Sequence, residues 1–138
     1  MSIDHNGMAV LPEDECLRRL RFRGMGRIAL SVGALPAIFP INFTVDGRDI
    51  YFRTAPGTKL DAAARNAVVA FEVDDVDPIS HTGWSVLVVG PAEEVRDPGE
   101  LERLRRLPLT RWVRGGEDSL IRIRAELVSG RELEGAVR

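Results

Sequence analysis

The stretch YFRTAPGTKLDAAARNAVVAFEVD, residues 51–74, passes through three kinds of local structure in succession. The run YFRT is rich in residues that favour strands, and Pro56-Gly57 then interrupts it. Residues 58–67 are alanine-rich and open with a threonine followed three residues later by an acid, a near match to the capping box that starts helices. Residues 68–73 return to a strand pattern. The stretch therefore predicts a strand, a tight corner, a helix and a second strand.

The corner concentrates side chains that bind anions: Arg53, Thr54, Thr58 and Lys59. A helix N-terminus has unpaired backbone N–H groups and a partial positive charge, so it binds phosphate readily. Lys59 in the first helical turn opposes that dipole, and an anionic partner would compensate for it. The spacing matches neither a Walker A loop nor a Rossmann glycine motif. The corner predicts a phosphate site, and the alternative is a simple helix cap with a solvated lysine.

Upstream of the corner, Asp46-Gly47 lies between two strand-like runs, 36–45 and 48–54. Asp-Gly in this setting is a strong signal for a hairpin with these two residues as its loop. Opposed side chains share a face of the sheet. One face is apolar and is predicted to be core: Ile41, Phe43, Val45, Ile50 and Phe52. The other face is mostly polar: Pro40, Asn42, Thr44, Asp49, Tyr51 and Arg53.

Further strands and helices flank this unit. Helices are expected at 12–20 and from Asp97 onward, because each opens with acids and a proline and the first continues into arginines. Residues 26–33 resemble a strand, and 83–95 form a nearly unbroken apolar strand, which suits burial on both faces or in a subunit interface. Residues 1–11 are expected to form a loose N-terminal arm.

Residues 119–128 alternate cleanly between apolar and charged side chains, as a half-buried strand does. The inward set is expected to be Ile121, Ile123, Ala125 and Leu127. The outward, solvated set is expected to be Arg122, Arg124 and Glu126. With about six strands and three short helices, the chain is predicted to be one mainly β domain over 1–138, an antiparallel six-stranded barrel.

Composition excludes several classes of protein. The formal net charge of −2 and pI near 5.7 argue against a non-specific nucleic-acid binder. One cysteine, Cys16, and two histidines argue against a disulfide framework, a thiolate zinc site or another metal cluster. Neither a secretory signal nor an apolar run of the roughly 20 residues needed to span a membrane is recognisable, so a cytoplasmic protein is expected.

Five segments resemble the pyridoxamine 5′-phosphate oxidase-like family of FMN-binding split barrels, and in particular its short actinobacterial-type and nitroimidazole-reductase-like members. These segments are GRIAL at 26–30, PINFTVDG at 40–47, IYFRTAPGTKLDAA at 50–63, VAFEVD at 69–74 and GWSVLVVGPAEEV at 83–95. The resemblance covers roughly residues 12–130. It implies a homodimer with two flavins at the subunit interface.

The resemblance also implies where FMN would bind. The matching residues are Pro40, Ile41 and Asn42 beside the isoalloxazine ring, Arg53 and Thr54 at the flavin and its tail, Thr58, Lys59 and Leu60 at the phosphate, and Trp84 and Ser85 on a strand that completes the pocket across the dimer. Trp84 is also explained by packing alone. Trp112 is a weaker match to a residue that reaches the flavin or substrate from the partner subunit.

The implied function is an FMN-dependent oxidoreductase that transfers hydride through flavin N5 to a small molecule whose identity the sequence does not reveal. No side chain stands out as a catalytic acid or base, and no late Arg/His/Tyr cluster supports pyridoxamine 5′-phosphate as the substrate. His81 is expected to be a solvated loop residue and Cys16 a small buried hydrophobe.

Three alternatives stay open on the same fold, of which the simplest is a dimer with an empty cleft, where Lys59→Ala would leave every ligand affinity unchanged. A deazaflavin coenzyme would need extra cations for its polyglutamyl tail, for which Arg65, Arg111 and Arg114 are available. A non-catalytic flavin-binding or sensing protein would use the same pocket without turnover.

Overall fold

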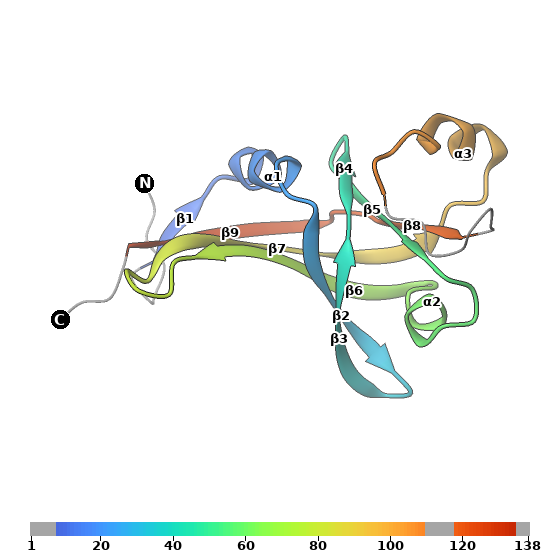
Figure 1. The fold of residues 1–138 in the computed structure, drawn as a ribbon, viewed down its shortest axis with the longest axis horizontal. Helices are drawn as coiled ribbons and strands as arrows, with labels where there is room; N and C mark the ends of the chain where they lie inside the picture. The colour runs from blue at the N-terminus through green and yellow to red at the C-terminus, as the bar shows by residue number, and fades with distance from the viewer. Residues whose placement is uncertain (1–7, 110–117, 135–138) are drawn as a thin grey trace.

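The structure, a computed structural model, describes residues 8–109 and 118–134. Within these ranges the chain forms nine strands and three short helices (Figure 1). The helices are α1 (Glu13–Arg21), α2 (Lys59–Ala63) and α3 (Pro98–Leu104). The strands are β1 (Ala9–Leu11), β2 (Met25–Val32), β3 (Leu35–Asn42), β4 (Thr44–Asp46), β5 (Asp49–Thr54), β6 (Ala67–Val76), β7 (Thr82–Glu94), β8 (Ser119–Ile123) and β9 (Leu127–Glu134).

The strands form one curled antiparallel sheet in the order β3-β2-β6-β7-β8-β5-β4, with β9 also paired to β7 and β1 paired to β9. The predicted mainly β, antiparallel class with three short helices is confirmed. The sheet has nine strands rather than six because two predicted strands are each divided in two and because Ala9–Leu11 pair with β9. The expectation of a loose arm is therefore wrong for Ala9–Leu11.

The first division lies at Phe43, where the chain changes partner. β3 pairs with β2, and Asn42 lies opposite Met25, whereas β4 pairs with β5. Between them, the Phe43 backbone N–H donates to the Gly24 carbonyl at 2.9 Å, and the Phe43 ring is buried in the core. Only β4, residues Thr44–Asp46, pairs with β5 as the predicted hairpin requires. β3 instead forms a hairpin with β2.

The hairpin register also differs from the prediction, by two residues. Asp46 pairs with Asp49, so the loop is Gly47-Arg48, and Gly47 adopts φ +65°. Because side chains alternate with period two, a shift of two residues leaves each side chain on its predicted face. This is why the apolar face was assigned correctly even though the pairing was wrong.

The second division is a β-bulge that separates β8 from β9. Both strands pair with the same edge of β7, but three residues, 124–126, lie opposite only two, Gly90 and Pro91. One extra residue reverses the inward and outward positions beyond the bulge. Leu127 is consequently 67% exposed rather than inward as predicted.

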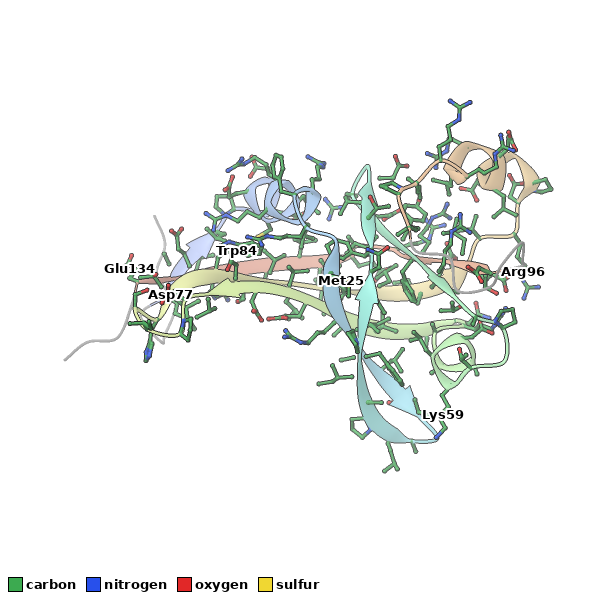
Figure 2. The ribbon with its side chains drawn as sticks, in the orientation of Figure 1. Met25, Lys59, Asp77, Trp84, Arg96 and Glu134 are labelled. Atoms are coloured by element: carbon green, nitrogen blue, oxygen red, sulfur yellow. The ribbon has the colours of Figure 1, made fainter. Side chains whose placement is uncertain are left out.

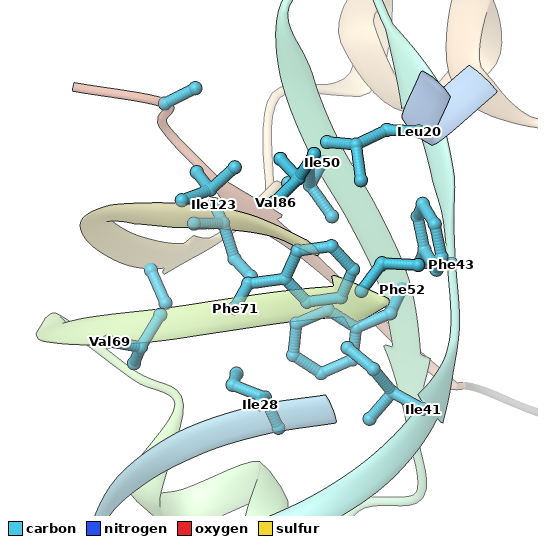
Figure 3. Close-up of a cluster of buried hydrophobic side chains, with 14 of the residues drawn as sticks. Leu20, Ile28, Ile41, Phe43, Ile50, Phe52, Val69, Phe71, Val86 and Ile123 are labelled. Atoms are coloured by element: carbon cyan, nitrogen blue, oxygen red, sulfur yellow. The ribbon is translucent and has the colours of Figure 1, made fainter. Parts of the chain in front are cut away.

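Two apolar clusters form the core. The larger one fills the curled sheet and includes Phe43 and Phe71, whose rings meet edge to face with centroids 4.7 Å apart (Figure 3). The smaller one lies under α3 and consists of Tyr51, Val95, Leu104 and Leu120. Tyr51, expected on a polar face, is therefore buried by α3.

Arg122 was expected to be a solvated residue, and this expectation is wrong. It is 6% exposed, and its guanidinium donates to the Tyr51 hydroxyl at 3.0 Å and to Glu100 of α3 at 2.6 Å. Burial would lower the pKa of Arg122, but the hydrogen bonds that its guanidinium donates to Tyr51, Glu100 and Glu93 raise the pKa above its usual value. α3 covers this face of the sheet, which a strand-by-strand analysis of the sequence could not show.

We predict that Gly90→Ala destabilises the fold by at least about 2–3 kcal/mol, because overpacking against fixed backbone forces the chain to shift. A Cβ at Gly90 would lie 1.7 Å from the carbonyl oxygen of Arg124, at the bulge. Urea unfolding measures the effect. The control is Gly24→Ala, whose nearest neighbour would lie at 3.7 Å and which should change stability by less than about 0.5 kcal/mol. Equal urea concentrations at the unfolding midpoint for the two variants would contradict the close packing of the bulge against Gly90.

Candidate functional site

The corner between β5 and α2 opens on a hollow of about 270 Å³. Its wall is formed by Phe39, Arg53, Thr54, Ala55, Thr58, Lys59 and Leu60. Five of the ten residues expected to bind the cofactor therefore come together here. Phe39 was not among them. It lies on β3, beside the predicted Pro40, and reaches the hollow because the β2–β3 hairpin folds toward α2 (Figure 1).

Two cations face this hollow. Arg53, on β5, is only 9% exposed, and Lys59 extends from the start of α2 toward the β2–β3 hairpin (Figure 2). Lys59 is the only lysine among the 19 lysines and arginines of the sequence. None of the ion pairs among the described residues involves it, whereas arginines such as Arg65 and Arg122 are paired with carboxylates. Lys59 is thus available to an external anion.

The shape of the corner depends on Asp61, whose importance the sequence signalled only through the capping box. Its carboxylate, 5% exposed, accepts hydrogen bonds from the Thr54 hydroxyl at 2.6 Å, from Arg65 at 3.1 Å and from the Gly57 N–H at 3.4 Å. Burial alone would raise the pKa of Asp61, but the hydrogen bonds from Thr54 and Arg65 outweigh it and leave the pKa below its usual value. Asp61 therefore holds the end of β5 and the start of α2 together.

These contacts decide which groups at the corner can still bind a ligand. The Thr54 hydroxyl proton is committed to Asp61, and the Thr58 hydroxyl donates to the Ala55 carbonyl at 2.9 Å while accepting from the Asp61 N–H. In the first turn, the N–H groups of Lys59 and Leu60 have no carbonyl within the helix to donate to. The Lys59 ammonium and the Arg53 guanidinium line the hollow, and these two N–H groups lie beside them.

α2 is shorter than the predicted 58–67, because Asn66 adopts φ +56° and β6 begins at the next residue. A helix of five residues has little dipole of its own. The positive character of the corner therefore comes mainly from the two side-chain cations.

Three predicted ring-contacting residues, Pro40, Ile41 and Asn42, point in different directions. Ile41 is 3% exposed in the core, and the Asn42 amide donates to the Gly24 carbonyl at 2.8 Å. Pro40 lies on the outer face of the sheet and lines a separate hollow of about 180 Å³ together with Arg27, Glu72 and Asp74. Burial and a hydrogen bond with Asp74 raise the pKa of Glu72 to about 7, although Arg27 lies near both carboxylates.

Trp84 and Ser85, on β7, lie far from the corner within one chain, toward the opposite end of the sheet from Lys59 (Figure 2). Trp84 packs under α1, with the guanidinium carbons of Arg19 and Arg23 at 5.6 Å and 5.4 Å from a ring centroid. Ser85 faces the outer side of the sheet, opposite Asp74 of β6. One chain thus does not assemble all ten predicted residues in one place.

The remaining singled-out residues do not contribute to the hollow. His81 is exposed in the turn before β7, where it adopts φ +59°. Cys16 is fully buried, as predicted, and burial raises the pKa of its thiol. Trp112 lies outside the described residues. Nowhere in residues 8–109 and 118–134 do three His, Cys, Asp or Glu side chains cluster as a metal site requires, and no helix of these ranges is long and apolar enough to cross a membrane.

The sequence of this chain is similar to those of known proteins. The family model described as pyridoxamine 5′-phosphate oxidase matches residues 12–132. An uncharacterized protein of Mycobacterium tuberculosis is 43% identical over 126 residues, covering 87% of this chain and 82% of its own.

Solved structures of similar proteins have the same fold. An FAD-binding protein from Mycobacterium smegmatis superposes with a TM-score of 0.84 at 39% identity, over 93% of this chain and 100% of its own. An FAD-binding protein from Mesorhizobium loti gives a TM-score of 0.69 at 28% identity, over 92% and 98%. The predicted split-barrel fold is confirmed.

We predict that Asp61→Asn lowers the free energy of unfolding at pH 7 by about 2–3 kcal/mol, because it removes the charged acceptor of the Thr54 hydroxyl and one of the two carboxylates that Arg65 binds. The folded-state pKa of Asp61 is lowered, so its stabilising contribution is present above the unfolded pKa of about 3.9 and is lost as the pH falls through the folded value.

Urea unfolding of wild type and variant from pH 3 to pH 7 tests this prediction. The difference in stability should shrink toward the acid end. The exposed Asp14→Asn on α1 is the control and should change little at any pH. A difference that stays constant across the range would show that the Asp61 charge does not support the corner.

Proposed function

Because this chain belongs to the pyridoxamine 5′-phosphate oxidase family, we propose that it is a flavin-dependent oxidoreductase whose corner between β5 and α2 binds the flavin phosphate. The observation that carries the proposal is the convergence of Arg53 and Lys59 on one hollow, beside the two first-turn N–H groups of α2. The phosphate next to the ribityl chain is common to FMN and FAD, so the corner suits either. The FAD-binding relatives support a flavin as the ligand.

The donors fit a phosphate group. Two cations and two backbone N–H groups provide charge-assisted hydrogen bonds, and Gly57 at φ +81° has no atom near the position of a Cβ, so its backbone is open to a close ligand. Phe39, Ala55 and Leu60 supply an apolar wall that suits the carbon skeleton of a flavin.

When bound, the flavin would supply two-electron transfer through its N5 atom to a small acceptor. Of the described residues that line the hollow, Arg53 and Lys59 are the ionisable ones, and both are cations. The chain's own part is therefore to bind the phosphate, to exclude water along Phe39 and Leu60, and to place positive charge beside the cofactor. No described side chain there is suited to act as a general base.

The deazaflavin alternative receives less support. Arg65, one of the cations available for a polyglutamyl tail, is bound to Asp61, Glu94 and the Ser119 hydroxyl. Arg111 and Arg114 lie outside the described residues. A flavin-binding protein without turnover uses the same hollow, and only reduction of the bound cofactor followed by reoxidation by an added acceptor separates the two.

We further propose that the chain forms a homodimer through the outer face of the sheet. Five directly paired residues form an unbroken apolar row across β3, β2, β6, β7 and β9: Ile38, Ala29, Ala70, Val89 and Leu127. Ile38 and Leu127 are each 67% exposed in the single chain. An exposed apolar row of this kind is typical of a protein interface.

The positions of the predicted site residues also favour a dimer. Pro40 and Ser85 lie on this same outer face, away from the corner of their own chain. A second copy on that face would allow residues from two chains to complete one pocket, as the family resemblance implies. The compartment and the acceptor are predicted from the sequence alone. We expect a cytoplasmic protein that acts on a small molecule.

We predict that Lys59→Ala and Arg53→Ala each weaken flavin binding at least about tenfold, because a hydrogen bond to a charged group contributes about 1.5–3 kcal/mol. Flavin fluorescence quenching, with FMN and FAD titrated separately, measures the affinity. Arg96→Ala, which removes a 75% exposed cation outside the lining of this hollow, should bind flavin normally. Unchanged affinity in both Lys59→Ala and Arg53→Ala would rule out this phosphate site.

Arg53 is buried, so its variant also requires a folding check, whereas wild-type Lys59 can be probed directly. As the only lysine, it carries the single side-chain amine that an amine-reactive ester can modify. Mass spectrometry of the labelled peptide should show that flavin protects Lys59 from modification.

For the dimer, we predict that Leu127→Asp raises the dissociation constant at least tenfold, because each interface then buries two unpaired carboxylates. Sedimentation velocity across a concentration series measures it. Ile79→Asp is the control, because Ile79 is 92% exposed in the turn before β7 and lies off the row. A wild-type protein that sediments as a monomer at all concentrations would refute the interface.

A further inference from the structure

A charged cluster lies on the outer face of the sheet, directly beside the apolar row of the proposed interface. The next row of paired residues along the same strands contains Pro40, Arg27, Glu72 and Leu87. Two residues along a strand span about 7 Å, so a partner that covers the apolar row also covers this one. Leu87 is 41% exposed and extends the apolar surface to the side of Glu72.

The cluster holds two carboxylates and one cation. Glu72 and Asp74 are two residues apart on β6, so they share the outer face, and Nη1 of Arg27 lies 3.4 Å from an oxygen of each. The two acidic side chains are 34% and 35% exposed, whereas that of Arg27 is 60% exposed. With both acids ionised, the cluster carries one uncompensated negative charge.

The strands on either side of this pair of acids add only uncharged side chains besides Arg27. These are Met25 of β2, Pro40 of β3, and Leu87 and Ser85 of β7, which lie opposite Glu72 and Asp74. The charged residue that follows on this face is Arg131 of β9, which lies opposite Ser85 and thus two strand spacings, about 10 Å, from Asp74. The protonation state of Glu72 is therefore set mainly within the cluster.

The Glu72 carboxyl accordingly titrates near neutrality. Burial and a hydrogen bond with Asp74 raise its pKa to about 7, and the attraction of Arg27 offsets only part of this rise. At pH 7 the group is therefore divided about equally between its neutral and ionised forms. When Glu72 is protonated, the charges of Asp74 and Arg27 cancel and the cluster is neutral.

We propose that the outer face binds a second copy of this chain in its protonated form, so that each chain takes up a proton at Glu72 on dimerisation. This coupling rests on the proposed homodimer, because a second copy is what removes water from the outer face. Desolvation of the cluster disfavours the ionised form. Twofold symmetry also places the same cluster on both subunits, and two uncompensated negative charges at one interface repel each other.

Both effects give the pH dependence the same direction. They make the pKa of Glu72 higher in the dimer than its value of about 7 in the single chain. The contribution of the proton to association is therefore fully present below about pH 7 and is lost as the pH rises through the higher pKa of the dimer. A partner cation placed against Glu72 would give the opposite direction, with tighter association at high pH.

Sedimentation velocity of the intact chain across a concentration series, at pH 6 and at pH 8.5, tests the coupling. The dissociation constant of wild type should be at least about tenfold higher at pH 8.5, because two protons per dimer are released. Glu72→Gln, an uncharged side chain of the same size, should dimerise as wild type does at pH 6 and keep that affinity at pH 8.5. The control Glu102→Gln changes a 69% exposed carboxylate on α3 and should retain the wild-type pH dependence.

The outcomes separate this coupling from the dimer itself. A wild-type dimer of equal affinity at both pH values, or one that tightens as the pH rises, would overturn the coupling and leave the interface standing. A pH dependence that persists in Glu72→Gln would assign the effect to other groups and overturn it as well. A wild type that stays monomeric at both pH values would refute the interface and the coupling together, without bearing on flavin binding at the corner.

Discussion

The packing of the 124–126 bulge against Gly90 is the constraint on which the arrangement of the sheet depends. β7 runs for 13 residues and pairs with β6 on one edge and with both β8 and β9 on the other. The carbonyl oxygen of Arg124 would be 1.7 Å from a Cβ at Gly90, so only glycine permits the crossing. The extra residue turns Ile123 inward and Leu127 outward. The bulge therefore places Ile123 in the core and Leu127 in the apolar row on the outer face of the sheet.

The candidate site depends on a second, electrostatic constraint. Asp61 is a buried carboxylate whose three donors come from the end of β5, the loop before α2 and the segment that follows α2. Because a buried charge is costly unless it is paired, these segments keep their positions to satisfy it. That leaves Arg53 and Lys59 directed at the hollow, while Thr54 and Thr58 use their hydroxyls within the protein. The sequence grouped all four residues by proximity, and the structure separates the two threonines, which shape the corner, from the two cations, which line the hollow.

Local signals predicted much of the fold, and features set by distant contacts were missed. The helix at 12–20, the Thr58 cap and the apolar face with Phe43 and Ile50 follow from capping and periodicity. The bulge was missed because the alternation of 119–128 continues smoothly through it. The burial of Arg122 was missed because it results from α3, which lies far away in sequence.

The distribution of cations ties these observations together. The described arginines on both faces of the sheet are mostly engaged with carboxylates, often in bidentate or bridging geometries such as Arg18 with Glu15. Arginine suits that role because its planar fork can bridge several acceptors, whereas lysine presents a compact charge on a flexible stem. A protein with 21 acids could neutralise a lysine almost anywhere, yet its single lysine lies where no described carboxylate pairs with it. An unneutralised cation beside a buried arginine repels it, and an anionic ligand relieves that repulsion. The one lysine of the sequence thus places a cation that no described carboxylate neutralises in the wall of the hollow between β5 and α2.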